Sequence, residues 1–309
     1  MAEKPSTKQM AVKQITSIEY FIQRVKEDCE EWKNFPWFRG EPASTTPLLP
    51  KLYRQKRGKD PNYENQLLQH FRMKSQSPEF GYTPPRDHTD QWLFLARHSG
   101  LPTRLLDWTE GSLVALYFAI VEQEALNEET GKKANPVVWM IDPIELNRLV
   151  VWWKRHKKCY VEDLSIALSN ITDEIYTRIV NDYESYRKRE FHESNVFPLT
   201  FLTIGIGIEN IRGAWEKNTV GTDFPVAVHP TNIHPRMSVQ KSCFTVHGKE
   251  KKPLNELLDK FGFKYLKRYV IDRRNMKLML EDLRMLGISY STLFPDLDGL
   301  AKDLEKRFQ

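Results

Sequence analysis

Residues Gln91 to Val121, QWLFLARHSGLPTRLLDWTEGSLVALYFAIV, decide the fold because they place polar side chains between two apolar runs. The first run, Trp92 to Ala96, predicts one buried element, and Leu113 to Val121 predicts a buried helix that follows a short polar strand or turn. Between them, Gly100 tolerates positive φ and Pro102 fixes φ, which favours a tight connection. We therefore expect polar chemistry inside a core element.

Two charges in this stretch, Arg104 and Asp107, flank an apolar Leu-Leu pair, and such charges are rarely buried unless they are paired. One interpretation is an Arg/Asp ion pair that ties the segment to its neighbours, with Thr109 and Ser112 capping the helix. The other places Arg104, Asp107 and Thr109 in a ligand cleft at the helix start, where free backbone N–H groups attract anions. The residues alone leave both interpretations open.

Five motifs along the chain occur in the order typical of one family. They are WFRG (Trp37–Gly40), LLPKLYR (Leu48–Arg54), the acidic helix opening at Tyr63-Glu64, HSGLPTRLLDWT with ALYFA (His98–Ala119), and LFPDLDGLA (Leu293–Ala301). In these motifs the chain resembles the FRG-domain family, named for its aromatic-Arg-Gly signature. The resemblance covers nearly the whole chain from Phe38 onward.

The layout is also similar to the NAD-binding arrangement of ADP-ribosyltransferases. This resemblance implies that Arg39 grips the phosphates of NAD and that the segment from Arg104 to Thr109 also contacts the nucleotide. Asp107-Trp108-Thr109 with Ala115 to Ala119 matches the second motif of those enzymes. Gly40 is expected to let the ligand approach the backbone closely. The implied fold is α+β, with a mixed, mainly antiparallel sheet flanked by helices, and the implied role is a toxin or phage-defence effector.

The third motif of those transferases is different here. The segment Val239 to Val246 carries Gln240, which fits the hydrogen-bonding half of that motif, but no carboxylate. Transfer of ADP-ribose needs a carboxylate to hold the ribose and to stabilise a cationic sugar. Either Glu64 or Asp107 does this work, or the fold binds a nucleotide without chemistry.

Each of these residues also has an ordinary structural interpretation. Arg39 offers a bidentate fork for a pyrophosphate, or it pairs with Glu41. His98 is a candidate general base or ribose contact, or it bonds to nearby backbone. Glu64 and Asp107 are candidate catalytic acids, or they are partners of Arg104 and acids of a first helical turn.

Composition excludes several classes of protein. The 309 residues carry 46 basic and 41 acidic side chains, and the net charge of +5 permits contact with nucleotides or nucleic acid. Three separated cysteines and eight scattered histidines argue against disulfides and against a metal site. No P-loop, Rossmann fingerprint or nucleophile elbow occurs. No apolar run is long enough to cross a bilayer, so we expect a cytoplasmic protein.

The partners expected are a nucleotide ligand, with NAD as substrate and no metal, and a macromolecular target that is a protein or nucleic acid. A different class of function is a non-catalytic module that recognises a nucleotide, nucleic acid or protein through a basic surface. Nothing in the sequence specifies an oligomeric state.

The chain is expected to have a flexible tail at 1–12 and a single domain at 13–309, with a helical insertion at 144–194. Periodicity predicts helices and strands along this domain. The helices are expected to begin at Ile18 and to cover Tyr63–Lys74, Val161–Leu168, Ile175–Lys188, Arg274–Leu286 and Leu297–Phe308. The strands are expected as short pieces within Pro36–Tyr53 and at Pro136–Ile141, Phe224–His229, Cys243–His247 and Tyr265–Ile271.

Overall fold

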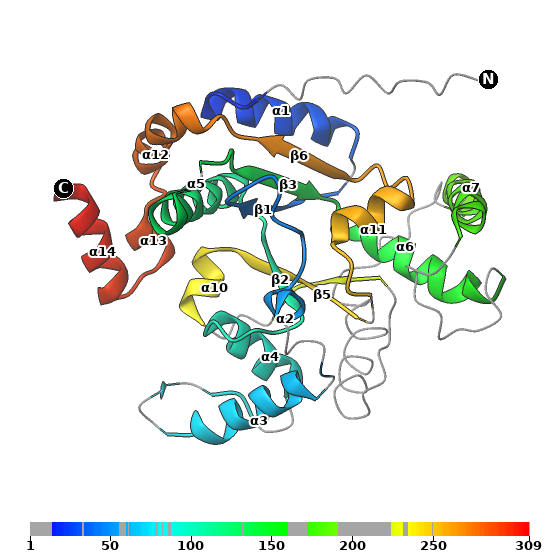
Figure 1. Ribbon diagram of the computed structural model, residues 1–309, viewed down its shortest axis with the longest axis horizontal. Helices are drawn as coiled ribbons and strands as arrows, with labels where there is room; N and C mark the ends of the chain where they lie inside the picture. The colour runs from blue at the N-terminus through cyan, green and yellow to red at the C-terminus, as the bar shows by residue number, and fades with distance from the viewer. Residues whose placement is uncertain are drawn as a thin grey trace.

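The computed structural model describes residues 14–308 apart from 33, 56–59, 61, 78–79, 82, 86–87, 132, 160–171, 191–223, 231–233 and 249. The expected tail at 1–12 and the expected helix from Val161 to Leu168 lie outside the described residues. Within them, helices surround one twisted sheet in an α+β arrangement (Figure 1).

The sheet has six strands in the order β4-β5-β2-β1-β3-β6, and each described ladder is antiparallel. The strands are β1 (Trp37–Glu41), β2 (Leu105–Thr109), β3 (Val137–Ile141), β4 (Val226–Val228), β5 (Ser242–Val246) and β6 (Leu266–Val270). An isolated parallel bridge joins Ile15 to Ile271 beside β6. The prediction of a mainly antiparallel sheet flanked by helices is confirmed.

The helices lie before, between and after these strands. They are α1 (Ile18–Glu30), α2 (Lys51–Arg54), α3 (Tyr63–Lys74), α4 (Thr89–His98), α5 (Ser112–Thr130), α6 (Pro143–His156), α7 (Asp173–Glu190), α10 (Pro235–Val239), α11 (Leu254–Lys260), α12 (Met276–Met285), α13 (Tyr290–Leu293) and α14 (Leu297–Phe308), with 3₁₀ turns η3 (Lys157–Cys159) and η6 (Arg273–Asn275). The expected bounds of α3 and α14 match the structure. None of the helices among the described residues has both the length and the apolar character that a membrane span needs.

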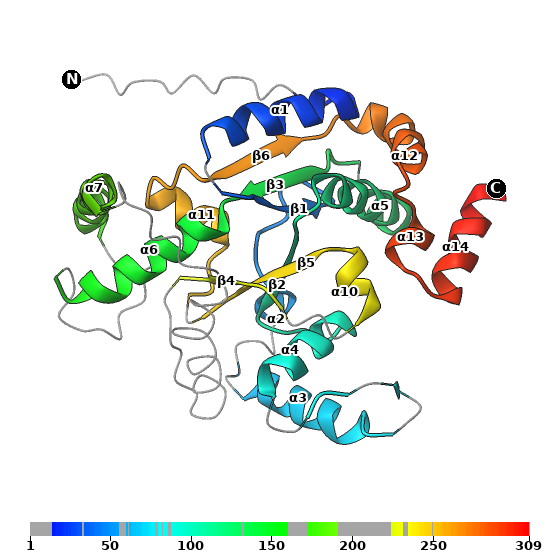
Figure 2. The same cartoon turned by 180° about the vertical axis from the view of Figure 1, so that it is seen from behind.

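Alternating side chains of the strands reach two separate cores. Phe38, Val138 and Met140 pack with α1, α5 and α12, whereas Trp37 and Trp139 pack with α6 and α11. Figure 2 shows these helix groups from behind the sheet. Helix α6 therefore contributes to a main core, while the insertion expected at 144–194 stays a prediction.

The sheet is divided between β1 and β2. These two strands share one paired position, Phe38 with Thr109, while β1 pairs with β3 and β2 pairs with β5 at five positions each. Two groups of three strands result, β1-β3-β6 and β2-β5-β4, and Figure 1 shows them as separate layers of ribbon. Beyond Phe38 the two groups separate, and side chains rather than a ladder connect them.

Several local predictions were wrong. Residues after Leu48 were expected to be β-like, but Lys51–Arg54 forms a single helical turn after Pro50, because proline supplies no ladder donor and suits a helix start. The connection around Gly100 and Pro102 was expected to include His98, but His98 is the last residue of α4. Gln240 is the C-cap residue of α10, two residues before β5.

The cap of α5 also differs from the prediction. The N-cap residue is Gly111, and Ser112 is the first helical residue instead of a cap. The Thr109 hydroxyl accepts a hydrogen bond from the Gly111 N–H at 3.0 Å. Thr109 therefore holds the turn that precedes the helix, while Ser112 contributes no cap.

Gly40 allows α5 to cross β1 at very short range. A Cβ atom at this position would lie 2.2 Å from the Ala115 carbonyl oxygen and 2.5 Å from the Ala119 nitrogen. Both contacts are with backbone, which cannot rotate away. The missing side chain therefore makes room for the helix. Gly40 also lines the cavity described below, and the close approach of a ligand to its backbone stays a prediction.

We expect Gly40→Ala to lower the free energy of unfolding by about 3 kcal/mol, because the added methyl overpacks the contact between α5 and β1. Denaturant unfolding followed by circular dichroism measures this change. Gly131→Ala is the control, because its φ of 67° is strained for alanine but no atom lies within 4 Å of the new methyl. The control should cost about 1–2 kcal/mol, and a smaller loss in Gly40→Ala than in the control would contradict the packing argument.

Candidate functional site

A cavity of about 390 Å³ lies where β1 and β2 separate. Its wall is built from β1, β2, α4 and α5, together with residues around α10 and α13. Charged groups in this wall come from each of the first four elements. They are Arg39, Asp107, Arg97 and Glu122, with Lys51 and Arg236 nearby on the same wall.

Arg39 bridges the two halves of the sheet. Its Nε donates to Glu41 Oε1 at 2.7 Å, and its Nη1 donates to the Asp107 carbonyl oxygen at 2.7 Å. The same Nη1 lies 3.5 Å from Asp107 Oδ2. Burial works against the charge, but the Glu41 and Asp107 carboxylates outweigh it and raise the pKa of Arg39. The guanidinium is therefore a fixed cation in the cavity wall.

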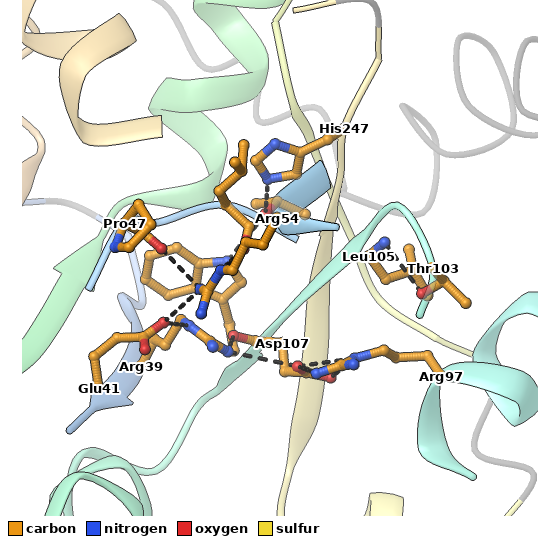
Figure 3. Close-up of polar contacts among 12 residues, drawn as sticks. Arg39, Glu41, Pro47, Arg54, Arg97, Thr103, Leu105, Asp107 and His247 are labelled. Carbon is orange, nitrogen blue, oxygen red and sulfur yellow. Dashed lines mark hydrogen bonds and ion pairs between the residues drawn. The ribbon is translucent and has the colours of Figure 1, made fainter. Parts of the chain in front are cut away.

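Asp107 lies between two arginines that approach it from opposite sides (Figure 3). Arg97 Nε donates to both carboxylate oxygens, at 2.9 and 3.0 Å, and Arg97 Nη2 donates to Oδ2. Burial alone would raise the pKa of Asp107, but the hydrogen-bonded Arg97 and the nearby Arg39 hold it below its usual value. Asp107 is thus a permanent anion at neutral pH.

Glu41 supports Arg39 from behind. Its side chain is 2 % exposed and also lies 3.5 Å from Arg54 Nη2. Arg54 is itself held by the carbonyl oxygens of Leu49 and Pro47, each at 2.8 Å. Figure 3 shows this row of alternating charges, from Arg54 through Glu41 and Arg39. These ion pairs and hydrogen bonds fix the orientation of the Arg39 side chain, although no backbone pairing connects β1 to β2 at Arg39.

Glu122 projects from α5 into the same cavity. Its side chain is exposed to the solvent of the cavity, but the surrounding protein displaces part of its hydration. This partial loss of hydration raises the pKa of Glu122 to about 7, against the opposing effect of Arg39. The cavity therefore contains two carboxyl groups whose environments move their pKa values in opposite directions.

His98 lies on the cavity wall beside a second imidazole. Its ring centroid is 4.3 Å from that of His234, and its Nε2 has no hydrogen-bond partner within the described part of the chain. Burial, reinforced by His234 and Arg236, lowers the pKa of His98 to about 4. His98 is therefore neutral at pH 7.

Aromatic side chains form the apolar part of the wall. Trp108 is buried, and its Nε1 donates to Thr245 Oγ1 at 3.1 Å. The aromatic rings that line the cavity come from β1, α5, β5 and the loop after α13, as Phe38, Phe118, Phe244 and Phe294. Such rings offer flat apolar faces beside the charged groups.

The C-terminal part of the chain closes one side of the cavity. Arg236 lies over the Phe294 ring, with 5.2 Å from the guanidinium carbon to the ring centroid, and donates to Asp296. Gln240 Nε2 donates to the Leu293 carbonyl oxygen at 3.0 Å. The Thr109 hydroxyl donates to the Gln240 carbonyl oxygen at 2.7 Å. These bonds hold the α10 and α13 segments against β2.

The structure brings most of the predicted site residues together and leaves two elsewhere. Those that line the cavity are Arg39, Gly40, His98, Asp107, Trp108, Thr109 and Gln240. Glu64 and Arg104 do not line it. Arg104 Nε donates to Glu64 Oε2 at 2.6 Å, and the Arg104 backbone N–H donates to Glu64 Oε1 at 2.8 Å. This pair joins α3 to the start of β2.

The sequence analysis missed four charged residues of the cavity, Lys51, Arg97, Glu122 and Arg236. Arg97 directly precedes the HSGLP motif, and Arg236 lies in a polar segment without a recognisable pattern. Glu122 had a usable signal, because Ala115, Phe118 and Glu122 follow one another at helical spacing and share one face of α5. All three residues of that face line the cavity.

The part of the chain that the structure describes contains no group of three or more His, Cys, Asp or Glu side chains that could hold a metal ion. The three cysteines, Cys29, Cys159 and Cys243, are free thiols. The charged and titratable side chains that line the cavity belong to three arginines, one lysine, two carboxylic acids and one histidine.

Comparison with known families gives one match. The family model described as FRG domain matches residues 34–128. This range contains Arg39, Arg97, Asp107 and Glu122, whereas Arg236 lies outside it. No curated protein and no solved structure matches the chain.

Glu64→Gln is expected to lower the free energy of unfolding by about 3 kcal/mol, because it removes the buried carboxylate that pairs with Arg104. Denaturant unfolding measures this loss. The matched control is Glu27→Gln, which removes an exposed partner of Arg24 and should cost less than about 1 kcal/mol. Equal stability of the two variants would show that the Glu64 pair is not structural.

His98 and the buried His247 should both stay neutral when the folded protein is brought to pH 5, since burial lowers the pKa of His98 to about 4 and that of His247 to about 3. Unfolded histidine has a pKa near 6.5, so the unfolded chain takes up protons first and the free energy of unfolding falls as pH drops from about 6.5 toward 4. Imidazole ¹⁵N NMR, with signals assigned by His98→Asn and His247→Asn, tests this. A titration midpoint near pH 6.5 for either residue would contradict it.

Proposed function

We propose that this chain, which belongs to the FRG-domain family through residues 34–128, binds NAD or a similar nucleotide in the cavity and transfers ADP-ribose from it. One observation carries the proposal: Arg39 and Asp107, a fixed cation and a fixed anion from different strands, face one cavity. A site for this reaction needs the cation for the phosphates and the anion for the sugar.

The charge of the wall supports binding of a phosphate-bearing ligand. Four cationic side chains, Arg39, Lys51, Arg97 and Arg236, line the cavity against two carboxyl groups. Arginine binds phosphate oxygens through its planar fork. The cavity volume, about 390 Å³, falls in the range of small-molecule sites.

The aromatic and acidic groups support recognition of the rest of the nucleotide. The partly exposed rings of Phe118 and Phe294 offer faces for a flat base. Asp107 stays ionised beside them, and a fixed carboxylate stabilises a sugar that becomes cationic when its glycosidic bond breaks. Glu64, the other candidate acid, belongs to the structural pair with Arg104 and has no part in this proposal.

The wider implications of the sequence resemblance belong to the same proposal. They are an ADP-ribosyltransferase-like arrangement of the sheet, a role as a toxin or phage-defence effector that modifies a protein or nucleic acid, and action in the cytoplasm. The order of the motifs supports them.

A non-catalytic nucleotide-binding module is the second candidate function. The observation that favours it is the composition of β5, Ser242–Val246, which has no carboxylate at the place where the transferases carry their late glutamate. In this case the cavity binds the nucleotide and leaves its glycosidic bond intact.

Isothermal titration calorimetry with NAD, together with an assay of nicotinamide release, tests the proposal. Arg39→Lys keeps the charge but loses the fork, so its Kd for NAD should rise at least about tenfold. Asp107→Asn should keep NAD binding, because a negative charge is removed, while nicotinamide release falls about 10²- to 10³-fold.

Arg24→Gln is the control, since the Arg24 side chain is exposed and α1 contributes no residue to the cavity wall. It should behave as wild type in both measurements. Binding without release in the wild type would favour the non-catalytic module. Absence of NAD binding in the wild type would reject the proposed function.

A further inference from the structure

We propose that Glu122 is a catalytic residue of this site, the general base that removes the proton from the hydroxyl that attacks the sugar, while Asp107 remains a fixed anion. This inference rests on the proposed function. In ADP-ribosyltransferases a glutamate late in the chain supplies a carboxylate, which β5 lacks here. We assign that role to Glu122, which lies on the face of α5 that lines the cavity.

The position of Glu122 is set by the crossing of α5 over β1. The backbone atoms of Ala115 and Ala119 lie so close to Gly40 that no side chain fits between them. Glu122 follows Ala119 by three residues and Ala115 by seven, so it lies on the same helix face. The packing at Gly40 therefore directs Glu122 into the cavity next to Arg39, which lies beside Gly40 in β1.

Charged groups from four other elements surround the Glu122 carboxyl. They are Arg39 and Glu41 of β1, Asp107 of β2, Arg54 of α2 and Arg97 of α4. The two acids raise the pKa of Glu122, and the three arginines lower it. Partial loss of hydration is the largest influence and raises this pKa to about 7, although the side chain is exposed to the solvent of the cavity.

Glu122 also differs from Asp107 in its contacts. Within the described residues, no hydrogen bond and no ion pair within 4 Å holds the Glu122 carboxyl, whereas Arg97 holds both oxygens of Asp107. A carboxylate bound by two arginines makes a poor proton acceptor, because protonation would sacrifice those bonds. The two carboxyl groups therefore suit different tasks, a stabilising anion and a proton acceptor.

The transfer step balances with these groups alone. The bond between the ribose C1′ and the nicotinamide nitrogen breaks, and its electron pair neutralises the positive charge of that nitrogen. The oxygen of the attacking hydroxyl, from water or from a target, forms a new bond to C1′, and its proton passes to the Glu122 carboxylate. A general base with a pKa near the working pH accelerates such a step.

The test measures NAD binding by calorimetry and nicotinamide release between pH 5 and 9, for wild type, Glu122→Gln and the control Glu128→Gln on an exposed part of α5. Wild-type release should increase with pH and level off above about 7, since the base acts in its ionised form. Glu122→Gln should bind NAD but lose about 10²- to 10⁴-fold in kcat, together with the rising part of the profile. Glu128→Gln should match wild type.

Glu122→Ala with added formate separates a catalytic role from a structural one. Formate is small enough to replace the missing carboxylate, and rescue of release would support the role of base. Circular dichroism confirms that each variant is folded.

Failure of the Glu122 assignment and failure of the proposed function give different results in these assays. If wild type binds NAD and releases nicotinamide while Glu122→Gln keeps both its rate and its pH profile, Glu122 is not the base, and the proposed function stands. If wild type neither binds NAD nor releases nicotinamide, the proposed function fails and Glu122 has no such role. Loss of release without formate rescue in a folded Glu122→Ala would also overturn the assignment.

Discussion

The Arg39 guanidinium is the interaction on which the site depends, because it connects two halves of a sheet that share one paired position. A continuous ladder between β1 and β2 would close the space between them. Here Arg39 reaches across to the Asp107 carbonyl oxygen, and Glu41 holds it from its own strand. The backbone separation that leaves room for the cavity is thus stabilised by the same side chain that gives the cavity its positive charge.

A second constraint, the contact of α5 with Gly40, positions Glu122 in the cavity wall. Close packing of a helix on a strand normally contributes stability alone, but here it also positions one helix face in the cavity wall. Asp107 and Glu122 then lie in one hollow with different environments. Asp107 is held ionised by arginines, and partial loss of hydration raises the pKa of Glu122 to about 7. The FRG region, residues 34–128, contains both acids and both constraints.

Sequence patterns predicted elements well where the pattern of apolar residues was clear, as for the helix at Tyr63–Lys74 and the strand at Pro136–Ile141. They were less informative about ion pairs. Glu64, Asp107 and Arg104 occur in neighbouring motifs, yet Arg104 pairs with Glu64 across 40 residues. Asp107 pairs with Arg97 of α4 and with Arg39 of β1 instead. Glu122 was not predicted as a site residue because a glutamate after an apolar helical run usually lies on the solvated face of the helix. Its place in the cavity wall depends on the crossing of α5 over Gly40, and local periodicity does not predict that crossing.

The central claim, that Arg39 and Arg97 face a nucleotide while Arg104 serves the structure, is tested most directly by NMR of arginine Nε–Hε groups during titration with NAD. The account predicts that the signals of Arg39 and Arg97 shift in proportion to the bound fraction while the signal of Arg104 stays in place. A shift of Arg104 without any change at Arg39 and Arg97 would contradict it.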